Sequence, residues 1–303
     1  MSKILVFGPA RVVETLTVAA LPEGALTEGT SYETVLGGQG ETVAVALARL
    51  GVRSVFSGRV GDDSGGKRLA RLLDTAGVDL STFHVDRAAQ TGHLVREVTP
   101  MGEERRIVFG GACRRLTEEE VKNAFLTAPD AACASAELAP AALCRIADAA
   151  ADRGIPFFLL HTGGAPQPPA LPSLEIYVTD EGTAEAVTGL RPGNADSCLQ
   201  TAIELQKRIA ARYYVIRLGE RGAFLYDGVY CHMVNSYIVR ETDARGADEA
   251  FFAALIAEYM RPEREILPAL SCAAAASALA VTHAGEATSP PTAEELFSFL
   301  ERN

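Results

Sequence analysis

The sequence lacks the cysteine pairs that are typical of metal sites and of disulfide-linked secreted domains. Its six cysteines are scattered along 303 residues, and none of them forms a Cys-x-x-Cys pair. Paired cysteines at such spacing are the usual ligands of zinc and the usual framework of small secreted domains. The sequence therefore predicts reduced thiols with structural roles in a cytoplasmic protein.

A hydrophobic run long enough to cross a membrane is also missing. The longest alanine-rich run, residues 272–281, has about half the length that a transmembrane helix needs. The apolar start of the chain, residues 1–7, leads directly into Gly8 and is too short for the core of a signal peptide. We therefore expect no contact with a membrane.

Positive charge is scarce. The chain has 28 basic against 39 acidic residues, which gives a formal net charge of -11. A negative surface repels the backbone of nucleic acids and anionic membranes, so neither is an expected partner. Hydrophobic residues make up 48% of the chain and charged residues 22%, which is ordinary for a folded globular protein. An anionic ligand must therefore be bound by local groups.

Apolar segments of strand type alternate with segments of helical period. Strands are predicted at residues 3–8, 54–57, 156–160, 175–178 and 213–217, and a hairpin at 223–234. Helices are predicted at residues 42–50, 67–76, 141–153 and 197–210, and almost continuously from residue 248 onward. This alternation predicts an α/β fold with a mostly parallel sheet flanked by helices, whose ligands bind beyond the carboxyl ends of the strands.

Two long excursions, at about residues 11–36 and 91–109, have β-type stretches but no helical period. We expect them to form strands of a small second sheet. Because no linker, repeat or low-complexity segment interrupts the chain, residues 1–303 are predicted to form a single domain.

Three glycine-rich segments lie between these elements. Glycines at residues 37–40, just before a helix, allow backbone amides to approach a polar ligand, although a plain turn into the helix explains them equally well. The acidic and serine residues at 61–66 are more simply explained as a helix cap. Residues 219–222 fit either a tight turn or the surroundings of a nucleotide.

The most informative segment is residues 243–252, where a glycine turn opens an apolar helix. Asp248 and Glu249 lie in the first turn of that helix. A helix N-terminus can stabilise a phosphoryl group that is being transferred, and a carboxylate there can deprotonate an attacking hydroxyl. Ordinary acidic capping remains the alternative for this segment when it is considered alone.

Together these segments resemble the ribokinase-like (PfkB) carbohydrate kinase family over essentially the whole chain. The order and spacing of the matching residues make the resemblance specific. They comprise the first strand to Gly8, Gly37-Gly38-Gln39-Gly40, Gly61-Asp62-Asp63, Gly77-Val78-Asp79, Glu137, Gly219, Gly222, residues 243–252, Gly285 and Pro291-Thr292.

The resemblance implies a ribokinase-like fold in which the small sheet is a lid, and an ATP- and Mg²⁺-dependent phosphorylation of a sugar or sugar-like alcohol. By position, the substrate would contact Gly37, Gly38, Gly40, Thr42 and Glu137. ATP would be bordered by Gly219, Gly222, Asp243, Thr282 and Gly285. The anion hole would be formed by Gly246 and Ala247, with Glu249 or Asp248 as the catalytic base.

Several positions depart from the family pattern. Val13 stands where the family has an aspartate for the substrate, and Thr42 where it has an asparagine. The family's Asn-x-x-Glu element is replaced by residues 180–183, which end in threonine. Its Gly-Ala-Gly-Asp element reads Gly246-Ala247-Asp248-Glu249, which puts a negative charge where glycine belongs.

Two functions therefore remain open at this point. The first is a divergent kinase for a sugar or sugar-like small molecule, and the second is a catalytically silent relative that binds a metabolite or nucleotide as a sensor or partner protein. The outer face of a lid sheet needs cover, and the lid of a second subunit would supply it. The sequence thus also predicts a homodimer.

Overall fold

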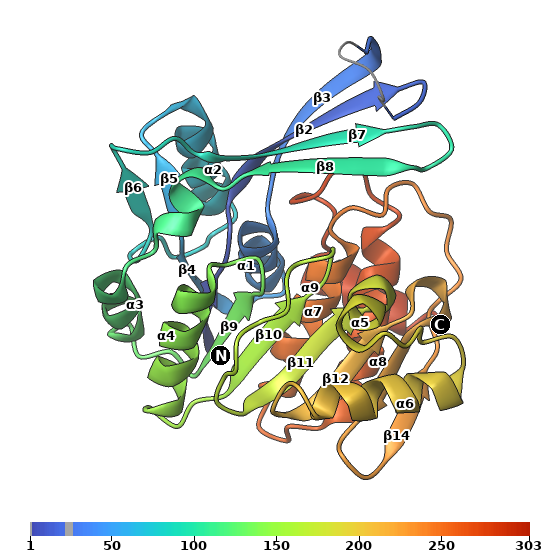
Figure 1. Ribbon diagram of the computed structural model, residues 1–303. Coiled ribbons are helices and arrows are strands. Elements are labelled where there is room, and N and C mark those ends of the chain that lie inside the picture. The colour runs from blue at the N-terminus through green and yellow to red at the C-terminus, as the bar shows by residue number, and fades with distance from the viewer. Residues whose placement is uncertain (1, 22–26) are drawn as a thin grey trace.

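The computed structural model describes residues 2–21 and 27–303, and an eight-stranded sheet forms its centre (Figure 1). The sheet order is β14-β13-β12-β11-β10-β9-β1-β4, parallel from β4 to β12, with β13 and β14 added antiparallel. The strands are β1 (Lys3–Phe7), β4 (Arg53–Ser57), β9 (Ala131–Ser135), β10 (Phe157–His161), β11 (Leu174–Asp180), β12 (Ala211–Arg217), β13 (Ala223–Tyr226) and β14 (Cys231–Val234).

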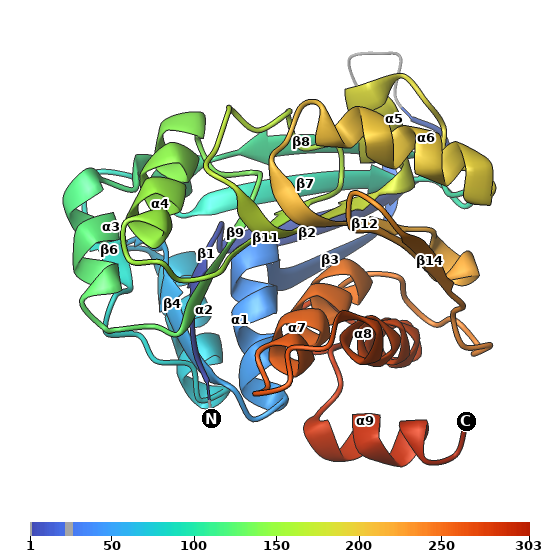
Figure 2. The same ribbon diagram turned by 90° about the horizontal axis from the view of Figure 1, so that it is seen from below.

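Helices cover both faces of this sheet (Figure 2). Alternate side chains of β1 show why: Ile4 and Val6 pack into one hydrophobic core, and Leu5 and Phe7 into the other. One face carries α1 (Gln39–Arg49), α2 (Ser64–Thr75), α7 (Ala247–Tyr259), α8 (Ile266–Ala280) and α9 (Ala293–Leu300). The other carries α3 (Glu118–Phe125), α4 (Pro140–Ala151), α5 (Glu181–Thr188) and α6 (Ala195–Gln206). The predicted mostly parallel sheet between helices is confirmed.

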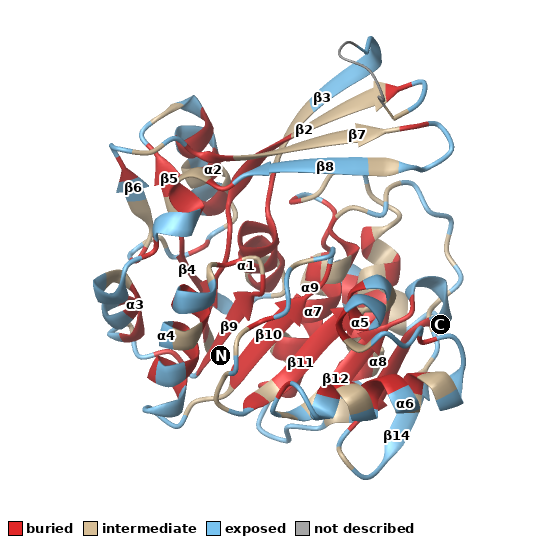
Figure 3. Cartoon of the chain, in the orientation of Figure 1, coloured by how far each residue is buried: buried red, intermediate tan, exposed pale blue. Residues whose placement is uncertain are grey.

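A four-stranded sheet of order β3-β2-β7-β8 projects over one edge of this core (Figure 1), and we call it the lid. Its strands are β2 (Arg11–Val18), β3 (Gly29–Gly37), β7 (Gly92–Val98) and β8 (Glu104–Phe109). They come from the two predicted excursions, of which residues 22–26 lie outside the described part. The lid is far less buried than the central sheet (Figure 3). A short pair, β5 (Arg59–Gly61) and β6 (His84–Asp86), lies apart from both sheets.

Some elements differ from the sequence prediction. Helix α1 begins at Gln39, three residues before the predicted start, because the glycine segment itself forms the first turn. The predicted helical block after residue 248 is interrupted by a loop between α8 and α9, at residues 281–292. Strand β9 was not predicted, because its sequence Ala-Ala-Cys-Ala-Ser has no β-branched or aromatic residue.

None of the helices in the described residues combines the length and the apolar character needed to span a membrane.

Candidate functional site

The predicted substrate residues meet where α1 begins, at the carboxyl ends of β9 and β10. Gln39, in the middle of the glycine segment, holds this start in place: its Oε1 accepts a hydrogen bond from Ser135 at 2.5 Å, and its Nε2 donates one to Thr162 at 2.8 Å. The amide of Gly38 donates to the Glu286 carboxylate at 3.0 Å. The loop between α8 and α9 thus reaches the glycine segment through Glu286.

The two positions that lost the family's hydrogen-bonding groups are both fully buried. Val13 on β2 presents only an apolar side chain. The hydroxyl of Thr42 lies 3.2 Å from Oε2 of Glu41, so the predicted substrate residue Thr42 makes its contact inside the protein. Burial, with the nearby Glu286 carboxylate, raises the pKa of Glu41 to about 8. Glu41 is therefore largely neutral at pH 7.

Glu137 follows β9, and its amide donates to the Ser135 hydroxyl at 3.1 Å. Its carboxylate accepts a hydrogen bond from Nη1 of Arg11 at 2.5 Å, and the Arg11 side chain is almost completely buried. This ion pair joins the lid strand β2 to the core. The family resemblance implies a position near the substrate for Glu137, but no feature of the sequence indicated that Arg11 is its partner.

The N-terminus of α7 carries the predicted anion hole and base. Gly246 caps the helix with a left-handed backbone, φ 81°, and a Cβ there would lie 2.5 Å from the Glu286 carbonyl oxygen. Glycine is therefore required at this position. Glu249 is only 7% exposed, and burial, together with the Glu286 carboxylate, raises its pKa to about 8 despite the opposing effect of Arg217.

The neighbouring Asp248 has a different environment from Glu249. Its carboxylate forms an ion pair with Arg217, at the end of β12. Arg217 also donates to the Ser277 hydroxyl at 2.7 Å and lies over the ring of Phe251, 5.1 Å from its centroid. Burial lowers the pKa of Arg217 to about 10, which leaves it charged at pH 7. The unexpected acidic residue in the helix turn thus has its own counterion.

A cavity of about 590 Å³ lies beside this ion pair, at the carboxyl ends of β11 and β12. A volume of this order is typical of ligand pockets. Of the predicted site residues, Gly219, Ala247 and Asp248 line it directly. The predicted Gly222, Asp243, Thr282 and Gly285 are outside its lining; Asp243 accepts a hydrogen bond from the Gly285 amide at 2.9 Å and an ion pair from Arg245 at 2.6 Å.

Five acidic side chains line this cavity, among them Asp180 and Asp248. Magnesium usually takes one or two protein carboxylates together with phosphate oxygens and water. Asp180 also caps α5 through the Thr183 amide at 2.6 Å, and Glu181 is engaged by Arg221. The described residues contain no cluster of three or more His, Cys, Asp or Glu side chains suited to a metal. A magnesium ion here would therefore depend on the phosphates of its ligand.

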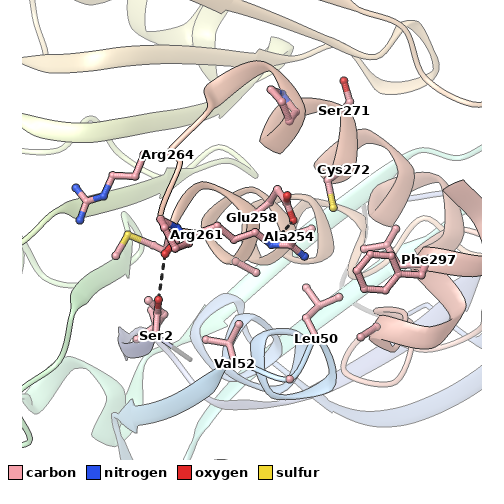
Figure 4. Close-up of a pocket in the computed structure, with 18 of the residues that line it drawn as sticks. Ser2, Leu50, Val52, Ala254, Glu258, Arg261, Arg264, Ser271, Cys272 and Phe297 are labelled. Atoms are coloured by element: carbon pink, nitrogen blue, oxygen red, sulfur yellow. Dashed lines mark hydrogen bonds and ion pairs between the residues drawn. The ribbon is translucent and has the colours of Figure 1, made fainter.

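A larger cavity, of about 1020 Å³, lies at the opposite end of the parallel strands (Figure 4). It is lined by residues from α7, α8 and α9, by the start of β1 and by the loop between α1 and β4, and Ser2 donates a hydrogen bond to the Met260 carbonyl at its edge. None of the predicted site residues lines it. We place the functional site at the smaller cavity because the buried carboxyl groups with raised pKa values, Glu41 and Glu249, and the lid lie at that end.

Sequence reasoning missed the residues that surround the predicted ones. They share one property, which is that each supplies an ionisable side chain from a separate segment: Arg11, Glu41, Arg217, Arg245 and Glu286. Only Arg217 had a usable signal, because it closes a predicted strand two residues before the glycine turn that begins at Gly219.

Comparison with known proteins identifies related chains over nearly the whole length. The profile described as "pfkB family carbohydrate kinase" matches residues 1–293. A ribokinase of Haemophilus influenzae is 26% identical over 283 residues, covering 92% of this chain and 91% of that protein.

Two solved structures show the same fold. Arabidopsis thaliana ribokinase complexed with ribose and ATP superposes with a TM-score of 0.86 at 24% identity, covering 99% of each chain. A putative ribokinase II of E. coli in complex with ATP and Mg²⁺ superposes with a TM-score of 0.79 at 21% identity, covering 100% of each chain. The predicted ribokinase-like fold is confirmed.

Proposed function

The chain belongs to the pfkB family of carbohydrate kinases, and we propose that it uses ATP to phosphorylate a hydroxyl of a sugar or sugar-like small molecule. The observation that carries this proposal is Glu249, a buried carboxyl in the first turn of α7 with a pKa raised to about 8. A base with a pKa near the working pH transfers protons efficiently. Glu249 would take the proton of the attacking hydroxyl.

Bound ATP would supply the phosphoryl group, and the cavity beside Gly219 is the place where this chain would hold it. The amides at the start of α7, after Gly246, would stabilise the charge on the transferring group. Asp180 and Asp248 would hold Mg²⁺ together with the phosphates. The ATP complexes of the Arabidopsis and E. coli proteins support this arrangement by analogy of fold.

Release of ADP from ATP and Mg²⁺ in the presence of a panel of sugars and polyols tests the proposal. We expect turnover above the no-substrate background with at least one compound, and a loss of roughly 100-fold or more in Glu249→Gln, because a base is removed at constant shape. Turnover of the parent should rise with pH through about 8, since only the deprotonated base accepts a proton.

The control variant is Asp248→Asn, which changes the adjacent residue that pairs with Arg217. We expect it to retain the pH profile of the parent. If Glu249→Gln leaves turnover and its rise through pH 8 unchanged, our assignment of Glu249 as the base is wrong. Loss of that rise in Asp248→Asn would then make Asp248 the base.

The ion pair between Asp248 and Arg217 favours a second candidate function, a catalytically silent protein that binds a metabolite or nucleotide. A carboxylate fixed at the helix N-terminus competes with a phosphate for the same amides. Thermal stabilisation by ATP without any substrate, combined with no ADP release across the panel, would favour this function over the kinase.

We further propose that the protein is a cytoplasmic homodimer joined through the lid. All six cysteines are free thiols, as expected in a reducing compartment. The outer face of the lid carries exposed apolar side chains, which supports a second subunit as its cover.

A further inference from the structure

Two arginines form a directly opposed pair on the lid. Arg96 of β7 is in register with Arg106 of β8, and Thr15 of β2 pairs with both Arg96 and Glu33 of β3. Side chains at paired positions lie on the same face of a sheet. Glu33 is bound by Arg245 of the core at 2.8 Å, so this face of the lid looks toward the core (Figure 1).

The charge of this pair is only partly neutralised. Nε of Arg96 and Nε of Arg106 each lie 2.7 Å from the same Oε1 of Glu104. Although burial alone would raise it, hydrogen bonds from Arg106 and Arg96 lower the pKa of Glu104 to about 2. Two guanidinium groups thus share one carboxylate. Like charges opposite each other destabilise a sheet, and one positive charge is left over.

The core carboxylates below the lid have other hydrogen-bond partners. Glu137 accepts from Arg11 and Glu286 accepts from the Gly38 amide. Both are close enough to raise the pKa of Arg106, in addition to the larger effect of the hydrogen bond that Arg106 donates to Glu104. Among the described residues, neither forms a hydrogen bond with Arg96 or Arg106, whose side chains are 17% and 46% exposed. A ligand can therefore reach the excess charge.

The same face of the lid offers little for a neutral sugar. Val13 lies two residues from both Arg11 and Thr15, so it shares their face, and it is fully buried and apolar. An uncharged polyol would have few hydroxyl contacts on this side, whereas an anion would meet planar guanidinium groups that bind carboxylates and phosphates through two parallel hydrogen bonds.

Resting on the proposed function, we infer that the substrate carries an anionic group, a carboxylate or a phosphate ester, which binds between Arg96 and Arg106 while its free hydroxyl faces Glu249. The lid then selects a sugar acid or a sugar phosphate over the neutral sugar.

Calorimetric titration in the absence of nucleotide tests this inference. The ligands are panels of aldonic acids including gluconate, sugar phosphates including glucose 6-phosphate, and neutral sugars including glucose, all at equal ionic strength. We expect an anionic compound to bind at least about 10-fold more tightly than its neutral counterpart, which corresponds to about 1.4 kcal/mol. The panel that binds identifies the group as carboxylate or phosphate.

The double variant Arg96→Met and Arg106→Met should abolish this preference. The matched control is Arg105→Met, because Arg105 neighbours Arg106 in the strand but points to the opposite face, where it pairs with Glu97 at 2.5 Å. It should bind like the parent. Anion binding that survives the double variant, or a panel in which no anion binds better than its neutral counterpart, would overturn the inference.

ADP release, measured separately, distinguishes this inference from the proposed function. Arginine-dependent binding of an anionic sugar without ADP release leaves the anion site standing and refutes the kinase. ADP release with neutral sugars alone, unchanged in the double variant, supports the kinase and refutes the anion site.

Discussion

At the scale of single residues, burial sets the pKa of the carboxyl groups at this site, and the residue type alone does not. Glu41 and Glu249 are both ordinary glutamates in the sequence, yet the pKa of each is raised to about 8 because each is buried, with the Glu286 carboxylate nearby. By contrast, the carboxylate of Asp248 is held in an ion pair with Arg217. Two adjacent acidic residues, Asp248 and Glu249, therefore face different environments, and this division assigns them different chemistry.

Glu41 gives a prediction about stability and pH. Its folded-state pKa of about 8 is above the ordinary value of 4.5, so the folded state binds the extra proton between these two values. The contribution of Glu41 to the free energy of unfolding is therefore full below pH 4.5 and is lost as the pH rises through 8. Glu41→Gln, which stays neutral, should be similar to the parent at pH 5 and more stable at pH 9 by about 4 kcal/mol, because each unit of pKa shift corresponds to about 1.4 kcal/mol.

Urea unfolding of both proteins at the two pH values measures this difference, and other titrating groups cancel because both proteins share them. A constant difference in stability between pH 5 and pH 9 would show that Glu41 is charged in the folded protein at neutral pH.

At the scale of elements, the start of α1 is fixed by a close approach of two backbones. A Cβ added at Gly40 would lie 2.5 Å from the carbonyl carbon of Gly8, at the end of β1. At the other end of α1, Gly51 has a left-handed φ of 78° but no atom within 4 Å of an added Cβ. The two glycines that bound the helix are thus required for different reasons.

We expect Gly40→Ala to lower the free energy of unfolding by about 3 kcal/mol, because α1 must move away from β1. Gly51→Ala, the control on the same helix, should cost only about 1 kcal/mol of backbone strain. Chemical unfolding measures both. Equal losses would mean that contact between Gly8 and Gly40 does not limit the position of the helix.

At the scale of the whole molecule, the fold could be predicted because its periodic elements are local in the sequence. The strand ending at Gly8, the hairpin turned at residues 227–228 and the two lid excursions all have their own signals. The charge partners could not be predicted, because Arg11 and Glu137 are 126 residues apart and Gly38 and Glu286 are 248 apart. Such pairs form only when folding brings the lid and the loop between α8 and α9 next to the carboxyl ends of the strands.

The outer face of the lid leads to the remaining prediction, which concerns assembly. Ile107 pairs with Val95, and Phe109 pairs with His93. Ile107 and Phe109 lie one and three positions after Arg106 in the strand, so their side chains point to the opposite, outer face. Tyr32 pairs with Leu16 on the same outer face. Tyr32 is 62% exposed, Ile107 52% and Phe109 51%. An open sheet face with such side chains is expected to pair with a second copy.

Sedimentation velocity at micromolar concentration should therefore detect a dimer of the parent protein. Ile107→Glu combined with Phe109→Glu should shift it to monomer, because the pairing of two lids would bury charges without partners. The control is Val229→Glu, a residue 77% exposed in the turn between β13 and β14, away from the lid, and it should remain dimeric. A parent that sediments as a monomer would refute the lid-mediated dimer. A dimer that persists in the double variant would place the interface elsewhere, since the lid pairing requires the apolar side chains of β8.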